Sequence, residues 1–327
     1  MSSIYYLMRN TVDYAGLFPP AGLPMTQVVE NFSRYAACKE HSMLSRLIIP
    51  AMKLTAFEES ATALLPSDPE TEAWKISALV PSIEQQNGSL DHSKFDLAFE
   101  AIYQFNLRHA HDNHISAVVD AVELKTPNQA VLDCTLMRLV QDERFKGIRA
   151  FLEVPHSNDP SDMLESIAKQ PGATVFAKIR TGGVKPDLIP PVSDVARFIH
   201  ACAKHELGFK ATAGLHHPIR AKHKLTYEPD SESATMHGFL NVFVAAAIAF
   251  EHQVEVSSLE EILGATSTDV FDFQEDKLTW NGLSVPLASI SDTRNHGIVS
   301  FGSCSFVEPT EELVQLPGIS RKSIFPA

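Results

Sequence analysis

Short apolar runs alternate with helix-like segments along the sequence, and this alternation constrains the fold more than any other feature. Most of these runs are rich in β-branched residues, and they typically end in or next to Pro, Gly or a charged residue. Buried strands that alternate with helices are typical of parallel βαβ units. Eight such runs are present: Tyr14–Phe18, Leu47–Ala51, Ile76–Pro81, Ser116–Lys125, Gly147–Pro155, Thr174–Arg180, Gly208–Gly214 and Gly297–Ser303.

Eight strands favour a closed α/β barrel, the (β/α)8 TIM-like fold. An open doubly wound sheet has the same alternation, but no GxGxxG turn follows an early strand, which weakens that alternative. One barrel accommodates a chain of 327 residues, and no linker rich in Pro, Ser or Gly divides it. We therefore expect a single barrel domain over residues 1–327.

The alternation of apolar runs and helix-like segments is interrupted before the last strand. A helix signal at Ser258–Leu263 is followed by Val270–Phe273, a polar turn and Leu278–Trp280. Two short apolar segments around a polar turn indicate a small hairpin. The sequence thus predicts an insertion of a helix and a hairpin over about residues 252–296.

Composition limits the partners. The net charge of -13 opposes binding to nucleic acid or anionic membranes but not to a small anionic metabolite. The four cysteines form no CxxC pattern, and Met1–Asn10 lacks the apolar run of a signal peptide. The most apolar stretch, Phe239–Phe250, is far shorter than the roughly 20 residues needed to span a bilayer. We expect a cytoplasmic protein, with homo-oligomers possible.

Charged residues near the ends of the central runs are the first candidates for chemistry. Side chains alternate between the two faces of a strand, so the charged residues here face the barrel interior when the apolar ones face the helices. Buried charges must pair with one another or with a ligand, either as a structural salt-bridge layer or as an active site at the strand ends. The predicted inward set is Glu123, Lys125, Arg149, Glu153, Lys178, Arg180 and Lys210.

Lys178 and Lys210 are the most specific candidates for catalysis in this set. They lie on consecutive strands and are expected to be neighbours across the ladder. A lysine near other cations in a dry pocket has a lowered pKa, which makes its amine a nucleophile or a base. The sequence therefore predicts an activated lysine at the barrel mouth.

The segments AKIRTGG (177–183) and GFKATAG (208–214) resemble the sixth and seventh strands of deoxyribose-phosphate aldolases. This resemblance implies that Lys178 is a Schiff-base lysine and Lys210 its acid–base helper. The family also has an upstream catalytic aspartate; the nearby candidate is Asp120, which points outward by strict alternation. The motifs DYAGLFPPA, AKIRTGG, TAGLHHP, HGFLN and FGSCSF also resemble an uncharacterised group of bacterial hypothetical proteins, which implies no mechanism.

Polar residues in the later loops are candidate substrate contacts. Adjacent His216 and His217 follow the seventh strand, and His237 and Asn241 share one helix face at i and i+4. Histidines can bind a metal, transfer protons or contact an anion. If Glu123, Glu153, His216 and His237 converge, they form a site for a divalent metal. An anionic group is expected to contact Arg149, Arg180, Gly182, Gly183, Arg220 and Ser303 as well.

Three functions follow. The first is a cofactor-free class I aldolase-like lyase in which Lys178 forms an imine with a phosphate- or carboxylate-bearing carbonyl compound. Lys210 adjusts the reactivity of Lys178, and Glu153 or Glu123 transfers protons. The second is a metal-dependent lyase or hydrolase that uses the Glu and His residues. The third is a non-catalytic protein that binds a small anion.

Overall fold

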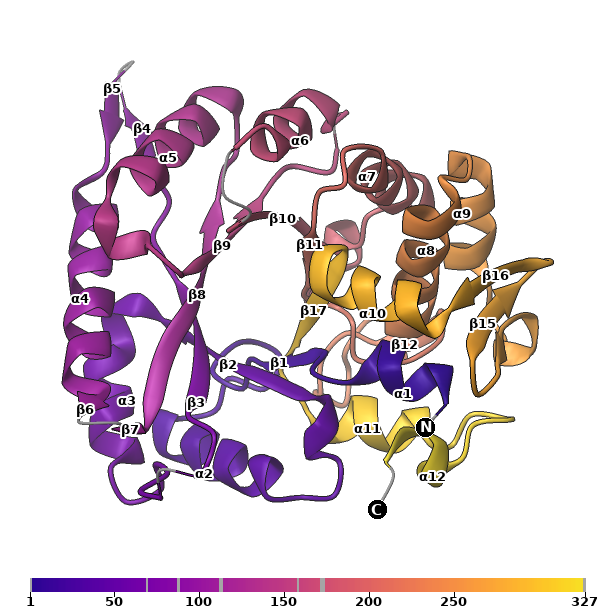
Figure 1. Ribbon diagram of the computed structural model, residues 1–327, viewed down its shortest axis with the longest axis horizontal. Coiled ribbons are helices and arrows are strands. Elements are labelled where there is room, and N and C mark those ends of the chain that lie inside the picture. The colour runs from indigo at the N-terminus through magenta and orange to yellow at the C-terminus, as the bar shows by residue number, and fades with distance from the viewer. Residues whose placement is uncertain are drawn as a thin grey trace.

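Eight parallel strands close into one barrel within the described part of the chain, which confirms the predicted fold (Figure 1). The computed structural model describes residues 2–68, 70–86, 89–111, 114–157, 159–170 and 174–325. Around the barrel the order is β1-β17-β11-β10-β9-β8-β3-β2, so barrel strands that follow one another along the chain lie side by side. The strands are β1 (Val12–Tyr14), β2 (Leu44–Pro50), β3 (Trp74–Leu79), β8 (Ala117–Lys125), β9 (Arg149–Glu153), β10 (Val175–Arg180), β11 (Phe209–Thr212) and β17 (Ile298–Ser303).

The barrel strands are buried on both faces. Outward residues such as Val122 and Leu124 join the large core beneath the helices. A separate inner cluster of Ala121, Phe151, Phe176 and Val299 fills the lumen. Side chains that fill the lumen make the barrel a packed core rather than a pore.

A helix follows each barrel strand and covers its outer face (Figure 1). Each helix presents an apolar side to the sheet, and α8 is buried on nearly all sides because α7, α9 and α10 surround it. None of the helices in the described ranges combines the length and apolarity that a membrane crossing needs. The helices are α2 (Met25–Ala36), α3 (Leu54–Ala61), α4 (Ser93–His109), α5 (Gln129–Gln141), α6 (Ser161–Ala168), α7 (Val192–Lys204), α8 (Phe239–His252) and α11 (Val307–Leu313).

The predicted insertion before the last strand is larger than a helix and a hairpin. After α9 (Val256–Gly264), strands β14 (Asp272–Phe273) and β15 (Lys277–Trp280) form the expected hairpin. A further strand, β16 (Leu283–Pro286), pairs with β15, and the helix α10 (Leu287–His296) leads into β17. The sequence did not predict β16, because a four-residue strand that ends in proline has almost no alternation to detect.

The first strand is displaced from its predicted range of Tyr14–Phe18. Val12 and Tyr14 pair with both β17 and β2, but the chain turns after Ala15, whose carbonyl accepts a hydrogen bond from the Phe18 amide. Leu17 and Phe18 therefore belong to a loop although they are apolar. Phe18 instead lines a cavity at the barrel mouth.

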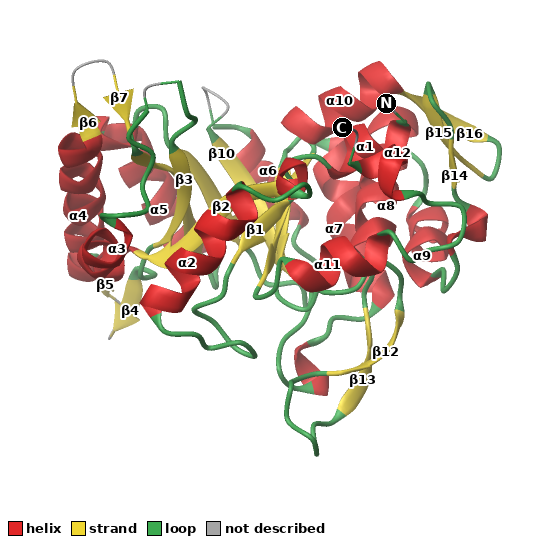
Figure 2. Ribbon diagram, turned by 90° about the horizontal axis from the view of Figure 1, so that it is seen from below, coloured by secondary structure: helices red, strands yellow, loops and turns green. Residues whose placement is uncertain are grey.

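The two ends of the barrel differ (Figure 2). The hairpin of β12 (Ala221–Lys224) and β13 (Ser233–Met236) and that of β4 (Glu84–Gln86) and β5 (Ser89–Asp91) project on the side where the barrel strands end. On the opposite side lie α10, the short helices α1 (Ser3–Met8) and α12 (Arg321–Ile324), and the hairpin of β6 (Ala110–His111) and β7 (His114–Ile115).

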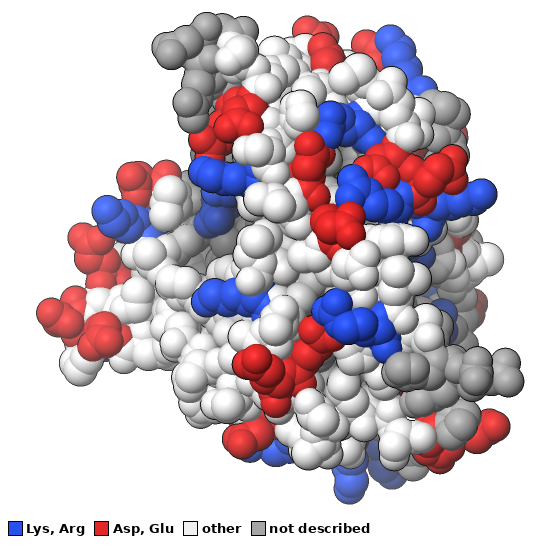
Figure 3. Space-filling model, turned by 90° about the vertical axis from the view of Figure 1, so that its left-hand side faces the viewer, with Lys and Arg blue, Asp and Glu red and all other residues white. Residues whose placement is uncertain are grey.

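The outer surface mixes charges of both signs. On the side of the molecule that carries α4, basic and acidic side chains of the described residues are interspersed (Figure 3). This face therefore offers no broad basic surface of the kind that nucleic-acid backbones require.

Candidate active site at the barrel mouth

A chain of ion pairs with alternating sign crosses the barrel lumen. The Lys210 ammonium lies 2.5 Å from Asp13 Oδ2 and 2.7 Å from Glu123 Oε1. The other oxygen of Glu123 lies 2.8 Å from Lys178 Nζ, which in turn is 2.9 Å from Glu153 Oε2. Each lysine therefore sits between two carboxylates.

Strand register brings these groups together. Lys178 is paired with Lys210 across β10 and β11 and with Glu153 across β9 and β10. Glu123 on β8 is placed opposite Phe151 on β9 and reaches both ammonium groups across the lumen. The four residues that the sequence singled out as catalytic candidates thus form one contiguous cluster.

Asp13 completes this cluster and was not among the predicted catalytic residues. Its fully buried carboxylate accepts hydrogen bonds from Ser300 Oγ at 2.6 Å and from the Arg46 backbone amide at 3.1 Å, besides Lys210. The local signal was the polar residue between Val12 and Tyr14 in a short apolar run. It was missed because the strand was expected to begin at Tyr14.

Lys178 forms part of the wall of a cavity of about 550 Å³ at the mouth. Glu123, Glu153, Lys125 and Arg180 also line it, together with apolar side chains such as Phe18, Ile48, Leu79 and Met236. Lys210 is fully buried and is not among the described residues of this lining. Of the two lysines, Lys178 is therefore the one that a substrate can reach.

The electrostatics correct one expectation. Burial acts to lower the pKa of Lys178, but the carboxylates of Glu123 and Glu153 outweigh it and raise that pKa. Burial likewise favours neutral carboxyl groups, but the two lysines hold the pKa of Glu123 well below its usual value. The prediction of a lowered lysine pKa was wrong, because carboxylates rather than other cations are the nearest charges to Lys178.

Glu153 lies nearer the opening than Glu123. Its side chain is 12% exposed against 1% for Glu123, and Arg180 Nε is 3.8 Å from its Oε1. Glu123 additionally accepts a hydrogen bond from Ser77 at 2.8 Å. Glu123 is thus held on both oxygens, whereas Glu153 keeps access to the cavity.

The glycines after β10 divide into two roles. Gly183 lines the cavity. At Gly182, a Cβ would lie only 2.9 Å from the Cα of Gly214, so this glycine permits the close approach of two strand ends. The carbonyl of Gly182 accepts a hydrogen bond from Arg180 at 3.1 Å, which orients that guanidinium. That Gly183 and Arg180 contact an anionic group of the substrate stays a prediction.

Arg149 does not lie at the mouth, contrary to prediction. It faces the lumen as expected, but it begins β9, four residues before Glu153, which corresponds to roughly 13 Å along the strand. It lines a second cavity, together with Arg46, at the opposite end of the barrel. Alternation identifies the face of a residue but not its height in the barrel.

Asp120 also departs from strict alternation. The register between β3 and β8 pairs Ile76 with Val119 and Ser77 with Ala121, so Asp120 is an extra residue in a bulge. Its carboxylate accepts hydrogen bonds from Arg46 Nε and Nη2, both at 2.7 Å. The expectation that Asp120 points outward was wrong because the bulge shifts the alternation at that residue.

His216 stands at the cavity wall with a cluster of polar partners. Its Nδ1 lies 3.1 Å from Glu308 Oε2 and 3.3 Å from Ser303 Oγ, and Cys304 Sγ is 4.0 Å away. Burial favours the neutral ring, but the contacts with Cys304 and Glu308 raise the pKa of His216 to about 9. Ser303 is buried and contacts His216 rather than the cavity.

His217 points away from the main cavity. Its ring stacks on His223, with centroids 3.4 Å apart, and its Nδ1 is 2.8 Å from Glu312. The two rings line a side cavity of about 330 Å³ that shares His216 with the main one. Direct contact of His217 with a substrate in the main cavity is therefore not supported.

His237 and Asn241 hold loops through contacts with the backbone, and Arg220 takes part through its backbone amide. His237 Nε2 is 2.8 Å from the Pro190 carbonyl, and burial lowers the pKa of its ring to about 4. The Asn241 side chain donates to two backbone carbonyls and accepts from the Arg220 amide at 3.0 Å. These contacts use all the polar atoms of the Asn241 side chain, which argues against its predicted substrate role. His237 Nδ1 has no hydrogen-bond partner among the described residues, and the substrate roles predicted for His237 and for the Arg220 side chain stay predictions.

The four residues proposed as metal ligands do not converge, since His237 is engaged elsewhere. Over the described ranges, no group of three or more His, Cys, Asp or Glu is arranged to hold a metal ion. Comparison of the chain with protein-family models, with curated proteins and with solved structures finds no match.

Proposed function

We propose that this barrel is a class I aldolase-like lyase in which Lys178 forms an imine with a small anionic carbonyl compound. The observation that carries the proposal is a lysine amine in the wall of a mouth cavity, held between two carboxylates, with a second, fully buried lysine beside it on the next strand. An amine, adjacent proton acceptors and a cavity for the carbonyl are what imine chemistry requires. The cavity volume of about 550 Å³ lies in the usual range for small-molecule sites.

The raised pKa of Lys178 assigns the first task to its neighbours. The ammonium must lose a proton before nitrogen attacks the carbonyl carbon, and Glu153 Oε2 at 2.9 Å is the acceptor with access to the cavity. The carbon–nitrogen bond then forms and the carbonyl oxygen leaves as water. Loss of water needs two protons on that oxygen. Glu153 returns the proton that it took from the ammonium, and it then transfers a second proton from the nitrogen of the adduct to the same oxygen, which leaves a protonated imine and restores the carboxylate.

Lys210 and Glu123 act without touching the substrate. Lys210 neutralises one oxygen of Glu123, and the other oxygen fixes the Lys178 ammonium. This fixes the direction from which the amine meets the carbonyl, which is a positioning role. Arg180 and Lys125, which also line the cavity, supply positive charge for the phosphate or carboxylate of the substrate.

Borohydride trapping tests the proposal. The purified protein is reduced in the presence of small aldehydes, ketones and 2-oxo acids, and adducts are located by intact mass and peptide mapping. We expect one adduct on Lys178 that is absent from Lys178→Arg, which keeps the positive charge but not the nucleophile. Lys125→Arg is the matched control because Lys125 lines the same cavity, and it should retain the adduct.

Other outcomes would contradict imine formation. Labelling confined to exposed lysines, or an adduct that persists in Lys178→Arg, means that Lys178 is not the nucleophile. Binding of a carbonyl compound without any adduct or turnover favours the non-catalytic anion-binding alternative.

A further inference from the structure

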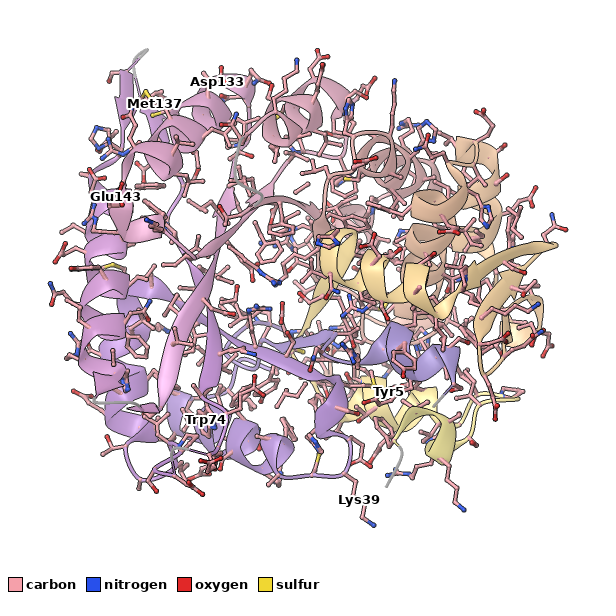
Figure 4. The ribbon with its side chains drawn as sticks, viewed as in Figure 1. Tyr5, Lys39, Trp74, Asp133, Met137 and Glu143 are labelled. Atoms are coloured by element: carbon pink, nitrogen blue, oxygen red, sulfur yellow. The ribbon has the colours of Figure 1, made fainter. Side chains whose placement is uncertain are left out.

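A second cavity, of about 700 Å³, opens at the N-terminal end of the barrel. Trp74 at the start of β3 and Tyr5 on α1 mark two of its walls (Figure 4). Among its described lining residues, five are lysine or arginine and one, Glu72, is acidic. This local excess of positive charge occurs in a chain whose net charge is -13. The basic residues are Arg9, Arg46, Lys75, Arg149 and Arg294.

Two of these cations are neutralised within the protein. Arg46 forms a bidentate pair with Asp120, with both nitrogen–oxygen distances at 2.7 Å. Lys75 pairs with Glu72 three residues earlier. These two ion pairs do not involve the guanidinium groups of Arg149 and Arg294, which also line the cavity.

The Arg149 guanidinium has no hydrogen bond or ion pair with any residue that the structure describes. Its guanidinium lies over the Phe176 ring, 5.8 Å from the centroid. Burial and the nearby charge of Arg46 lower the pKa of Arg149, and the carboxylates of Asp120 and Asp13 offset only part of that effect. A half-buried guanidinium with all its donors free inside a cavity is poised to bind an acceptor from outside.

Arg294 adds a second charge without a carboxylate partner. It is 8% exposed, and its bonds go to the backbone carbonyls of Ile298, Arg9 and Asn10. Its Nε has no hydrogen-bond partner among the described residues. Carbonyl groups satisfy donors but do not cancel a net charge, so Arg294 adds positive charge to this end of the barrel without an ion-pair partner among the described residues.

We infer that this cavity is a binding site for a phosphate-bearing small molecule, with Arg149 as its bidentate ligand. Burying unpaired charge is costly, and an anion bound to the Arg149 guanidinium removes that cost. A phosphate group carries a charge of about -1.5 to -2 at neutral pH, which suits the excess of basic over acidic residues in this lining better than a single carboxylate does. The planar fork of arginine fits two phosphate oxygens in parallel.

This site is separate from the one at the mouth. The described residues that line the two cavities form two sets with no member in common, and Arg149 and Glu153 stand at opposite ends of β9. The inference therefore does not depend on imine chemistry at Lys178.

Phosphate titration of the full chain tests the inference, with pyrophosphate as a second probe. Unfolding temperature and calorimetric binding are measured at constant ionic strength, with chloride as the reference anion. We expect phosphate to raise the unfolding temperature of the wild type and to bind at least tenfold more weakly to Arg149→Gln. Without phosphate, Arg149→Gln should be as stable as the wild type or more so, because it removes an unpaired cation.

Two control variants locate the anion. Arg197→Gln removes an exposed guanidinium on α7 and should bind phosphate like the wild type. Arg180→Gln removes the arginine at the mouth and should also retain binding. If Arg149→Gln does not unfold cooperatively, Arg149→Lys replaces it, since it keeps the charge, removes the fork and should weaken phosphate binding severalfold.

Four results would overturn the inference. These are no stabilisation of the wild type by phosphate, equal binding by Arg149→Gln or its lysine substitute, loss of binding in Arg180→Gln instead, or tighter binding of the dicarboxylate malonate than of phosphate.

Discussion

Lys178 and Lys210 stand in register on adjacent strands, and they bind opposite oxygens of one carboxylate at 2.8 and 2.7 Å. That carboxylate, Glu123, prevents direct repulsion between the two ammonium groups. It also couples them, because any change in its charge alters both lysines. The arrangement leads to predictions for stability and for proton transfer.

Substitution of Glu123 by glutamine should lower the free energy of unfolding by about 3–5 kcal/mol, because breaking a buried ion pair leaves uncompensated charge. Glutamine keeps the shape, so the loss reports charge rather than a cavity. Denaturation by guanidinium chloride at pH 7 measures this loss in the free energy of unfolding. The matched control is Glu165→Gln, which breaks the exposed pair with Lys169 on α6 and should change stability by less than about 0.5 kcal/mol. Equal effects of the two variants would contradict the prediction.

Substitution of Glu153 by glutamine should change the pH dependence of trapping at Lys178. The carboxylates raise the pKa of Lys178, so adduct formation in the wild type should increase with pH as the ammonium deprotonates. With one carboxylate neutralised, the rising limb should move to lower pH while the maximal rate falls, because the proton acceptor is lost. The measurement is the yield of reduced adduct on Lys178 against pH; an unmoved limb would exclude Glu153 as a partner in this step.

His216 should make stability depend on pH between about 6.5, its unfolded pKa, and 9. Its pKa is raised to about 9 in the folded protein. A raised folded pKa contributes stability that is complete below the unfolded value and is lost as pH rises through the folded one. The loss should reach at most about 3 kcal/mol in the wild type and be absent from His216→Gln. His296→Gln, at an exposed position, should retain the wild-type dependence.

Substitution of Gly182 by alanine should destabilise the protein by about 1–3 kcal/mol, because the new Cβ meets the Gly214 backbone at 2.9 Å. Gly264→Ala is the matched control: it ends α9, and a Cβ there meets nothing within 4 Å. The control should be neutral or slightly stabilising, since alanine favours helix more than glycine does. Thermal unfolding compares the two; a Gly182→Ala protein as stable as the control would refute the close-approach role.

The fold was predictable because a parallel barrel repeats one pattern eight times, and each repeat is strongly apolar. Face assignment also succeeded for Glu123, Glu153, Lys178 and Lys210, since all four follow regular alternation in central strands. The short strand β1 was displaced, because three residues that pair on both sides carry little pattern of their own.

Three features of the site could not be derived from alternation. The bulge at Asp120 depends on the register between β3 and β8, which is a property of two strands rather than one. The position of Arg149 at the far end depends on where β9 begins relative to its neighbours. The sign of the pKa shift at Lys178 depends on which charges across the lumen are nearest, and a linear sequence contains no such distances.

The carboxylate of Asp13 joins four elements that are distant in sequence, because β1 carries it while β2, β11 and β17 supply its donors. The strand β1 also occupies the seam between the last strand and the second. Closure of the barrel and completion of the charge chain consequently depend on the same strand. An open sheet that lacked β1 would leave Lys210 with one carboxylate instead of two, so a chain that has not closed cannot present the finished site.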